Sequence, residues 1–242
     1  MIDSLGSVDH GIARLSRSVS VLDLWAIFDT DELGRIILLS LSVSLSATAL
    51  ATLLGAPLGA ALAACAFPGR RILVVAVNAF LGLPPVVVGL ALYLLLSRSG
   101  PLGVLGLLFT PGAMELAQTV LALPIVTALV HSASADLWAE YGGALQVDGA
   151  TRLRAILHLL AMARFRLVTA VLAGFGRAIS EVGAILIVGG NIAGHTRTMT
   201  TAIVLETNKG NLSLALCLGL VLIGISIAVS ATIFAVGDRG GR

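Results

Sequence analysis

The sequence predicts an all-α polytopic membrane protein with about five transmembrane helices, and three observations carry this prediction. Apolar residues make up 57% of the 242 residues, and the mean hydropathy is +1.03. Charged residues make up only 12%, whereas an ordinary soluble domain has about 25%. Apolar runs of about 20 residues or more, long enough to cross a bilayer, recur along the chain. The net charge of +2 is too balanced to indicate a nucleic-acid partner.

The chain divides into an N-terminal interfacial segment, residues 1–35, and a transmembrane domain, residues 36–242. The N-terminal segment has no continuous apolar core, so it does not resemble a cleavable signal peptide. Ile12, Leu15, Val19 and Leu22 recur at helical spacing, which predicts a helix lying in the membrane interface; a frayed tail is the alternative.

The first crossing is predicted from Ile36 to about Ala66. It contains Gly55 and Gly59, a GxxxG pair that allows a neighbouring helix to approach closely. Small residues are frequent throughout this chain, so ordinary packing within the chain is the preferred interpretation.

The second crossing is predicted from Ile72 to Leu96, and Pro84 and Pro85 interrupt it. Two prolines remove backbone donors in the middle of the membrane, which is tolerated where protein or a water-filled path satisfies the freed carbonyls. The pair therefore indicates either part of a transport path or a packing kink. The loop 97–112 is predicted to be re-entrant or interfacial.

The remaining segments alternate between apolar and polar. They are a third crossing at about 114–134, a polar stretch at 136–166, a fourth crossing at 167–190, a polar loop at 191–211 and a fifth crossing at 212–236. Five crossings place the termini on opposite sides of the membrane. Eight arginines fall on one side, which the positive-inside rule makes cytoplasmic: Arg70, Arg71, Arg152, Arg154, Arg164, Arg166, Arg239 and Arg242. The stretch 136–166 is therefore predicted to be cytoplasmic, the N-terminus outside and the C-terminus inside.

The polar stretch 136–166 has two parts. Gly149 is predicted to end a helix in a turn. After it, Leu153, Ile156, Leu157 and Leu160 form an apolar stripe at helical spacing, which predicts an amphipathic helix lying against the bundle. Such a helix either binds a soluble partner or only anchors the loop.

Glu181 is the acidic residue deep in a predicted crossing, and Arg177 lies four residues before it on the same helical face. Intramembrane charges usually face a cavity or a partner, so a role in a transport path and a structural ion pair both remain open. Gly183 and its neighbouring glycines would permit a gap or a close helix contact.

The sequence argues against an enzyme. The four histidines are scattered, and no metal-ligand spacing such as HExxH is present. Lys209, the only lysine, does not lie in a P-loop, so any nucleotide hydrolysis must come from another chain. Cys65 and Cys217 lie in apolar runs and are interpreted as small buried hydrophobic residues.

Four segments resemble a known family. GALQVDGATRLRAILHLL at 143–160 resembles the cytoplasmic coupling loop of ABC importer permeases, with Gly149 at the motif glycine but Gly143 where the motif has an acidic residue. Three further segments look like the tungstate-type branch of those permeases: GLPPVVVGL at 82–90, SRSGPLGVLGLLFTPGAM at 97–114, and residues 174–212. The molybdate and sulfate branches of the same family share the coupling loop.

The resemblance implies the type I importer fold and a homodimer in the cell inner membrane, with a translocation path between the two copies. It also implies a cytoplasmic ATPase dimer, an extracytoplasmic oxyanion-binding protein, and ATP and magnesium bound by the ATPase rather than by this chain. The substrate would be an oxyanion, tungstate before molybdate. An ion-coupled carrier or channel without an ATPase, motivated by Arg177 and Glu181, and a non-transporting scaffold are the alternatives.

The resemblance and the charge pattern together give three groups of candidate site residues. The predicted ATPase-coupling residues are Gly143, Ala144, Leu145, Asp148, Gly149 and Arg152. The predicted residues of the path or gate are Pro84, Pro85, Arg177, Ser180, Glu181, Gly183 and Asn191. The outer loop contributes His195, Thr196 and Arg197.

Overall fold

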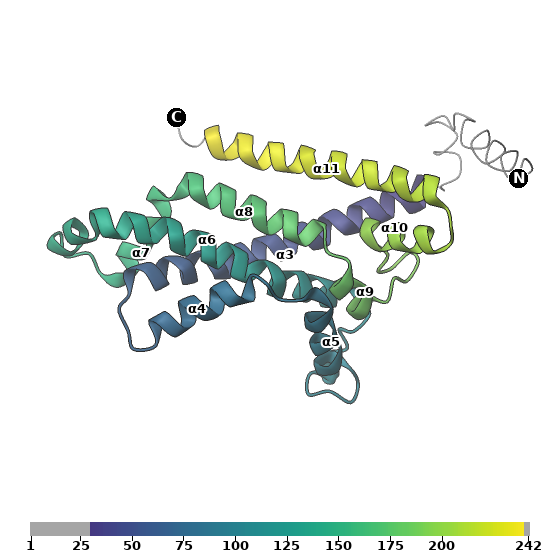
Figure 1. Ribbon diagram of the computed structural model, residues 1–242, viewed down its shortest axis with the longest axis horizontal. Coiled ribbons are helices and arrows are strands. Elements are labelled where there is room, and N and C mark those ends of the chain that lie inside the picture. The colour runs from purple at the N-terminus through teal and green to yellow at the C-terminus, as the bar shows by residue number, and fades with distance from the viewer. Residues whose placement is uncertain (1–29, 240–242) are drawn as a thin grey trace, which may run out of the picture. The chain divides into compact units, whose positions relative to one another are not determined.

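The computed structural model describes residues 30–239, and within this range the chain forms nine α-helices, one 3₁₀ helix and no strand (Figure 1). The chain divides into two compact units, 1–35 and 36–242, and the second contains the helical bundle. The interfacial helix predicted from Ile12 to Leu22 lies outside the described residues. The all-α fold class is confirmed.

Three helices are each long and apolar enough to cross a membrane: α3 (Thr30–Ala64), α6 (Pro111–Val147) and α11 (Leu212–Arg239). Two bent pairs supply up to two further crossings. In the first, α4 (Arg70–Phe80) and α5 (Pro85–Leu96) meet at 106°, and in the second α7 (Arg152–Met162) and α8 (Arg164–Ile179) meet at 78°. The described part of the chain thus has three to five crossings, which accommodates the predicted five.

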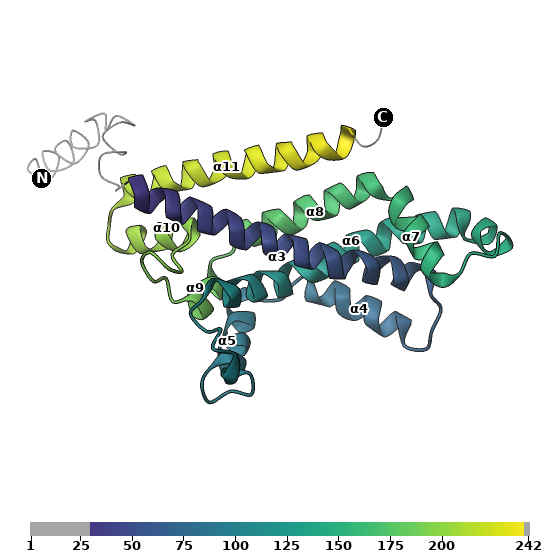
Figure 2. The same ribbon diagram turned by 180° about the vertical axis from the view of Figure 1, so that it is seen from behind.

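The predicted second crossing is not one straight helix. Its bend lies at the double proline, where Pro84 caps α5 in an extended conformation and Pro85 occupies the first turn. Proline fits the first turn of a helix because the missing N–H has no partner there. The pair therefore starts a new helix, and α5 turns away from the direction of α4, as Figures 1 and 2 show.

The prediction of a single fourth crossing at 167–190 is wrong. Helix α8 ends at Ile179, and the short helix α9 (Gly183–Gly189) begins only after a break at 180–182. The polar loop predicted at 191–211 also contains a helix, α10 (Met199–Asn208). Thr198 and Thr201 form a capping box at its start, and this box satisfies backbone donors that a loop would have left to water.

The two glycines of α3 bring it against α6. A Cβ on Gly59 would lie 2.6 Å from the carbonyl oxygen of Thr127, and one on Gly55 would lie 3.0 Å from the hydroxyl of the same threonine. The first distance leaves no room for a side chain and the second is tighter than most Cβ contacts, so the GxxxG pair serves packing within the chain, as expected. The cluster beside this contact consists largely of small residues: Ala51, Ala56, Ala60, Ala122, Val126, Val130 and Ala170.

A second close contact joins α5 to α9. A Cβ on Gly89 would lie 2.7 Å from the Cα of Ala184, so the two backbones nearly touch. Helix α8 lies beside α6, and α9 continues toward the start of α5 (Figures 1 and 2). The 3₁₀ helix η1 (Gly103–Leu105) lies in the predicted interfacial loop, where Val104 is fully exposed.

Candidate functional site

The end of α6 forms a tight turn at Gly149. This residue has φ +69°, in the left-handed region that favours glycine. Its N–H donates to the carbonyl of Gln146 at 3.1 Å, and the N–H of Ala150 donates to that of Leu145 at 3.0 Å. These two bonds are those of a Schellman motif, which ends a helix by satisfying its last carbonyls. The predicted helix-ending turn at Gly149 is therefore present.

The predicted coupling residues all lie in or beside this turn, on the last turns of α6 and the first turn of α7. Val147, which is not among the predicted residues, is the most exposed apolar side chain beside it, at 89%. Leu145 is half-buried and the other predicted residues are exposed: Gly143, Ala144, Asp148, Gly149 and Arg152.

Helix α7 forms where the amphipathic stripe predicts it, but it buries a different face. Ala155 and Leu159 are buried, with Ile156 and Leu160 half-buried beside them, whereas Leu153 is 67% exposed. Leu157 is exposed as well. The prediction that both leucines pack against the bundle is wrong, because α7 meets α6 on the side of Ala155 and Leu159. The exposed leucines extend the apolar surface of the turn.

An ion pair joins α6, the helix that leads into this turn, to α8, the helix that follows α7. Arg166 Nη1 of α8 lies 2.6 Å from Asp136 Oδ2 of α6, and both side chains are more than half exposed. An exposed pair contributes less than about 1 kcal/mol, so its effect is to align the helices rather than to hold them together.

The break between α8 and α9 is organised around Glu181. Its side chain is 2% exposed. Arg177 Nη1 lies 2.6 Å from Oε2, while Oε1 accepts a 3.0 Å hydrogen bond from the N–H of Ala184 at the start of α9. Both carboxylate oxygens are thus engaged within the chain, and the buried charge has a partner, as burial requires.

Other predicted path residues lie close to this break. A Cβ on Gly183 would lie 3.1 Å from Val86 Cγ2, so the start of α5, with Pro84 and Pro85, lies against the start of α9. Ser180 is exposed, and its hydroxyl donates to the carbonyl of Gly176 at 2.7 Å. The structure therefore brings together the residues of α5, α8 and the start of α9 that were predicted to form the path.

Asn191 and the outer-loop residues lie at the other end of α9. Asn191 has a positive φ of 50° and follows Gly190, which also has a positive φ. Thr196 is fully buried; its hydroxyl donates to the carbonyl of Gly189 and accepts from the N–H of Ile192, so it holds the loop's own shape. His195 is exposed and Arg197 is half-buried.

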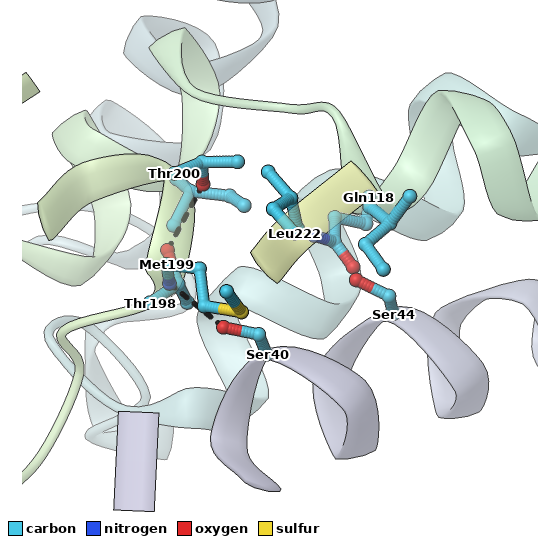
Figure 3. Close-up of a pocket in the computed structure, with 9 residues that line it drawn as sticks. Ser40, Ser44, Gln118, Thr198, Met199, Thr200 and Leu222 are labelled. Carbon is cyan, nitrogen blue, oxygen red and sulfur yellow. Dashed lines mark hydrogen bonds between the residues drawn. The ribbon is translucent and has the colours of Figure 1, made fainter. Parts of the chain in front are cut away.

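A group of buried polar residues that the sequence did not predict lies behind the break (Figure 3). Ser40 Oγ of α3 accepts from the N–H of Met199 at 2.8 Å, and Gln118 Nε2 of α6 donates to the carbonyl of Ala178 at 2.9 Å. The hydroxyl of Thr200 donates to the carbonyl of Glu181 at 2.9 Å. The sequence signal that could have identified these residues is a polar residue inside an apolar run. Within residues 30–239, no group of three His, Cys, Asp or Glu side chains could hold a metal ion.

No protein-family model matches the chain. Curated proteins do: the chain is 39% identical over 220 residues, 91% of its length, to the tungstate uptake system permease protein TupB of Peptoclostridium acidaminophilum, 96% of which is covered. It is 45% identical over 170 residues, 68% of the chain, to a probable anion ABC transporter permease protein of Haloferax volcanii, 73% of which is covered.

A more distant match is the molybdenum transport system permease protein ModB of Escherichia coli K12, 30% identical over 229 residues. That alignment covers 88% of the chain and 99% of the relative. These alignments run along most of both chains, and the structure carries several apolar helices able to span a bilayer. The chain therefore belongs to the ABC transporter permeases, in their tungstate and molybdate branch, and is a multi-pass membrane subunit.

Proposed function

We propose that this chain is the membrane-spanning permease of an ATP-driven importer of an oxyanion, with tungstate as the favoured substrate. The observation that carries the proposal is the 39% identity along 91% of the chain to a protein named for tungstate uptake. The chain works as a homodimer, with an ATPase dimer on the cytoplasmic side and a binding protein outside. ATP and magnesium bind to the ATPase.

The ATPase docks on the turn around Gly149. This turn offers Val147, Leu153 and Leu157, three exposed apolar side chains on a protruding pair of helices. Exposed apolar groups beside Arg152 and Asp148 are typical of a surface that a protein partner covers. The docked turn is cytoplasmic, which places the C-terminus inside and the N-terminus outside.

The translocation path runs along the exposed side of α8 and past the break. Thr169, Gly176 and Ser180 are exposed on one helical face, and small side chains there leave room between two copies. Arg177 is half-buried and shares its charge with Glu181. An arginine paired in this way keeps further N–H donors for an oxyanion but holds it less tightly than an unpaired cation would, as transport requires.

The alternative, an ion-coupled carrier or channel, is motivated by Arg177 and Glu181. A coupling carboxylate has to exchange its partner during transport, whereas both oxygens of Glu181 are engaged by Arg177 and by the start of α9. This arrangement favours the structural ion pair over the carrier.

The test is reconstitution of this chain in proteoliposomes with the ATPase and the binding protein. Tungstate-loaded binding protein is expected to stimulate ATP hydrolysis and tungstate uptake together. The absence of stimulation contradicts the proposal, and uptake by this chain alone without ATP supports the carrier instead.

The preferred ion is decided by the binding protein. Isothermal titration with tungstate, molybdate and sulfate gives the order of affinities, and tungstate is expected to bind most tightly. Tighter binding of molybdate would place this importer with the molybdate permeases.

A further inference from the structure

The amide of Gln118 is bonded on one side only. Gln118 is 2% exposed and lies in the part of α6 that passes behind the break between α8 and α9. Its Nε2 donates to the carbonyl of Ala178, near the end of α8. Its Oε1 has no hydrogen-bond partner among the described residues. A buried acceptor without a donor is uncommon in native proteins and calls for an explanation.

The orientation of the amide is fixed by its surroundings. The carbonyl of Ala178 can only accept a hydrogen bond, so the NH₂ group must face it and Oε1 must point the other way. On that side lies a pocket lined by Ser40, Ser44 and Thr198, among others. Figure 3 shows the Gln118 amide and the Ser44 hydroxyl pointing toward one another.

Water does not resolve the missing bond. The pocket has no space for a water molecule. The hydroxyl of Ser44 points toward the Gln118 amide and can donate to Oε1 (Figure 3). Ser44 comes from α3, whereas Gln118 belongs to α6, so this bond would form if α3 and α6 approached one another.

The hydrogen bond to Ala178 does not require a glutamine. The carbonyl of Ala178 also accepts from the N–H of Glu181 at 3.1 Å, so an apolar side chain at position 118 would leave no group of Ala178 unsatisfied. An apolar side chain would also remove Oε1, and the missing hydrogen bond of this buried oxygen costs stability. In the described structure the bond to Ala178 and the unsatisfied Oε1 have opposite effects on stability, so this bond alone does not account for a buried glutamine.

We propose that Gln118 is a positioning residue of the transport cycle. Its NH₂ group holds the end of α8 against α6, and its Oε1 accepts a hydrogen bond from Ser44 when α3 and α6 shift into the alternate state. This inference rests on the proposed transport function. Two packings of the same helices that differ by one buried hydrogen bond form a two-state element of the kind that ligand-driven transitions use.

The test compares Gln118→Met, Ser44→Ala and the double variant in the reconstituted complex. Each single variant is expected to lower tungstate uptake by about tenfold, while the melting temperature of the nucleotide-free complex changes by less than about 2 °C. The double variant is expected to lose no more uptake than either single variant, because both remove the same bond. Single variants that transport normally, or losses that multiply in the double variant, overturn the proposal.

A second measurement separates a state-specific bond from general packing. The melting temperature is compared between the nucleotide-free complex and the complex trapped with ATP and vanadate. Ser44→Ala is expected to lower it in one state and not in the other, and an equal change in both states overturns the proposal. Thr48→Val on α3 and Thr127→Val on α6 are the matched controls, since each buried hydroxyl donates to a carbonyl of its own helix. Both controls are expected to transport normally.

Failure of this inference differs from failure of the proposed function. If the wild-type complex does not transport an oxyanion, the proposed function fails before any variant is compared. If the wild type transports and the two variants behave like the controls, only the role of Gln118 is rejected.

Discussion

The hydroxyl of Thr200 donates a 2.9 Å hydrogen bond to the backbone carbonyl of Glu181, nineteen residues earlier in the chain. Thr200 lies in the first turn of α10, and Glu181 lies in the break between α8 and α9. The carbonyl of a residue in a helix break has no helical partner, so this side chain supplies the missing donor. The bond ties the break to helix α10.

Thr200→Val is therefore expected to destabilise the protein. The variant keeps the shape of the side chain but leaves the buried carbonyl of Glu181 without its donor, at a cost of about 1–3 kcal/mol. Thermal unfolding of the detergent-purified protein measures the effect. Thr200→Ser keeps the hydroxyl and is the control; a Ser variant as unstable as the Val variant would mean that the methyl group, not the bond, matters.

The Arg177–Glu181 pair predicts an order of stability among variants. Arg177→Met leaves the buried carboxylate without its cation and is expected to cost about 3 kcal/mol. Glu181→Gln keeps an oxygen for the N–H of Ala184 and removes the charge, so it is expected to cost less. Chemical denaturation of the two variants gives the order, and a Gln variant less stable than the Met variant contradicts it.

Gly149→Pro is expected to uncouple ATP hydrolysis from uptake. Proline fixes φ near −65°, whereas Gly149 has φ +69°, and proline also removes the N–H that bonds to Gln146. The turn can then no longer present the surface proposed to dock the ATPase. Uptake and ATP hydrolysis measured in the same proteoliposomes give the ratio, and normal uptake contradicts the coupling assignment. Gly224→Ala in α11 is the control, because it lies outside the predicted coupling residues and a Cβ there meets no atom within 4 Å.

The packing of α3 against α6 predicts that Gly59→Ala is destabilising. The added Cβ would lie 2.6 Å and 2.8 Å from backbone atoms of Thr127 and His131, which cannot turn aside as a side chain would. Overpacking of this kind typically costs about 1–3 kcal/mol. Gly219→Ala in α11, where the new Cβ meets open space, is the matched control. Equal melting temperatures for the two variants would exclude a close contact at Gly59.

Glu206 predicts an acid-dependent loss of stability. A hydrogen bond from Lys209, with another from Asn211, lowers the pKa of Glu206 below its ordinary value of 4.5. The charged carboxylate therefore stabilises the folded state above that value, and this contribution is lost as the pH falls through the lower pKa of the folded state. As the pH falls from about 7 to about 3, the melting temperature of Glu206→Gln is expected to fall less steeply than that of the wild-type protein. An identical slope in both proteins contradicts the assignment.

Local features of this protein could be predicted from the sequence. Apolar runs indicated the all-α fold class. The segments 82–90, 97–114 and 174–212, more than the 143–160 segment, indicated the family. Gly149 indicated its turn, because a left-handed helix end depends only on neighbouring residues. The prolines indicated the interruption at Pro84, but the break at Ser180 was not predicted. A helix break within an apolar run is stabilised by partners elsewhere in the chain, and composition does not name them.

The polar residues behind the break could not be placed for the same reason. Gln118 bonds to a carbonyl 60 residues away, and Ser40 bonds to an N–H 159 residues away. Their polar side chains within apolar runs mark these residues as unusual, but only the tertiary fold decides which backbone groups they bond to. The predicted buried face of α7 was wrong for a similar reason, because the position of α6 decides which leucines of α7 are covered.

The length of helix α6 has a mechanical consequence. Its 37 residues extend over about 55 Å, whereas the hydrocarbon core is about 30 Å thick. Gln118 stands near one end of this rod and the Gly149 turn follows the other, with a continuous helix between them. A displacement of the Gly149 turn is therefore expected to reach the pocket beside α3 through one helix, with Pro124 as the place within α6 where that helix can bend.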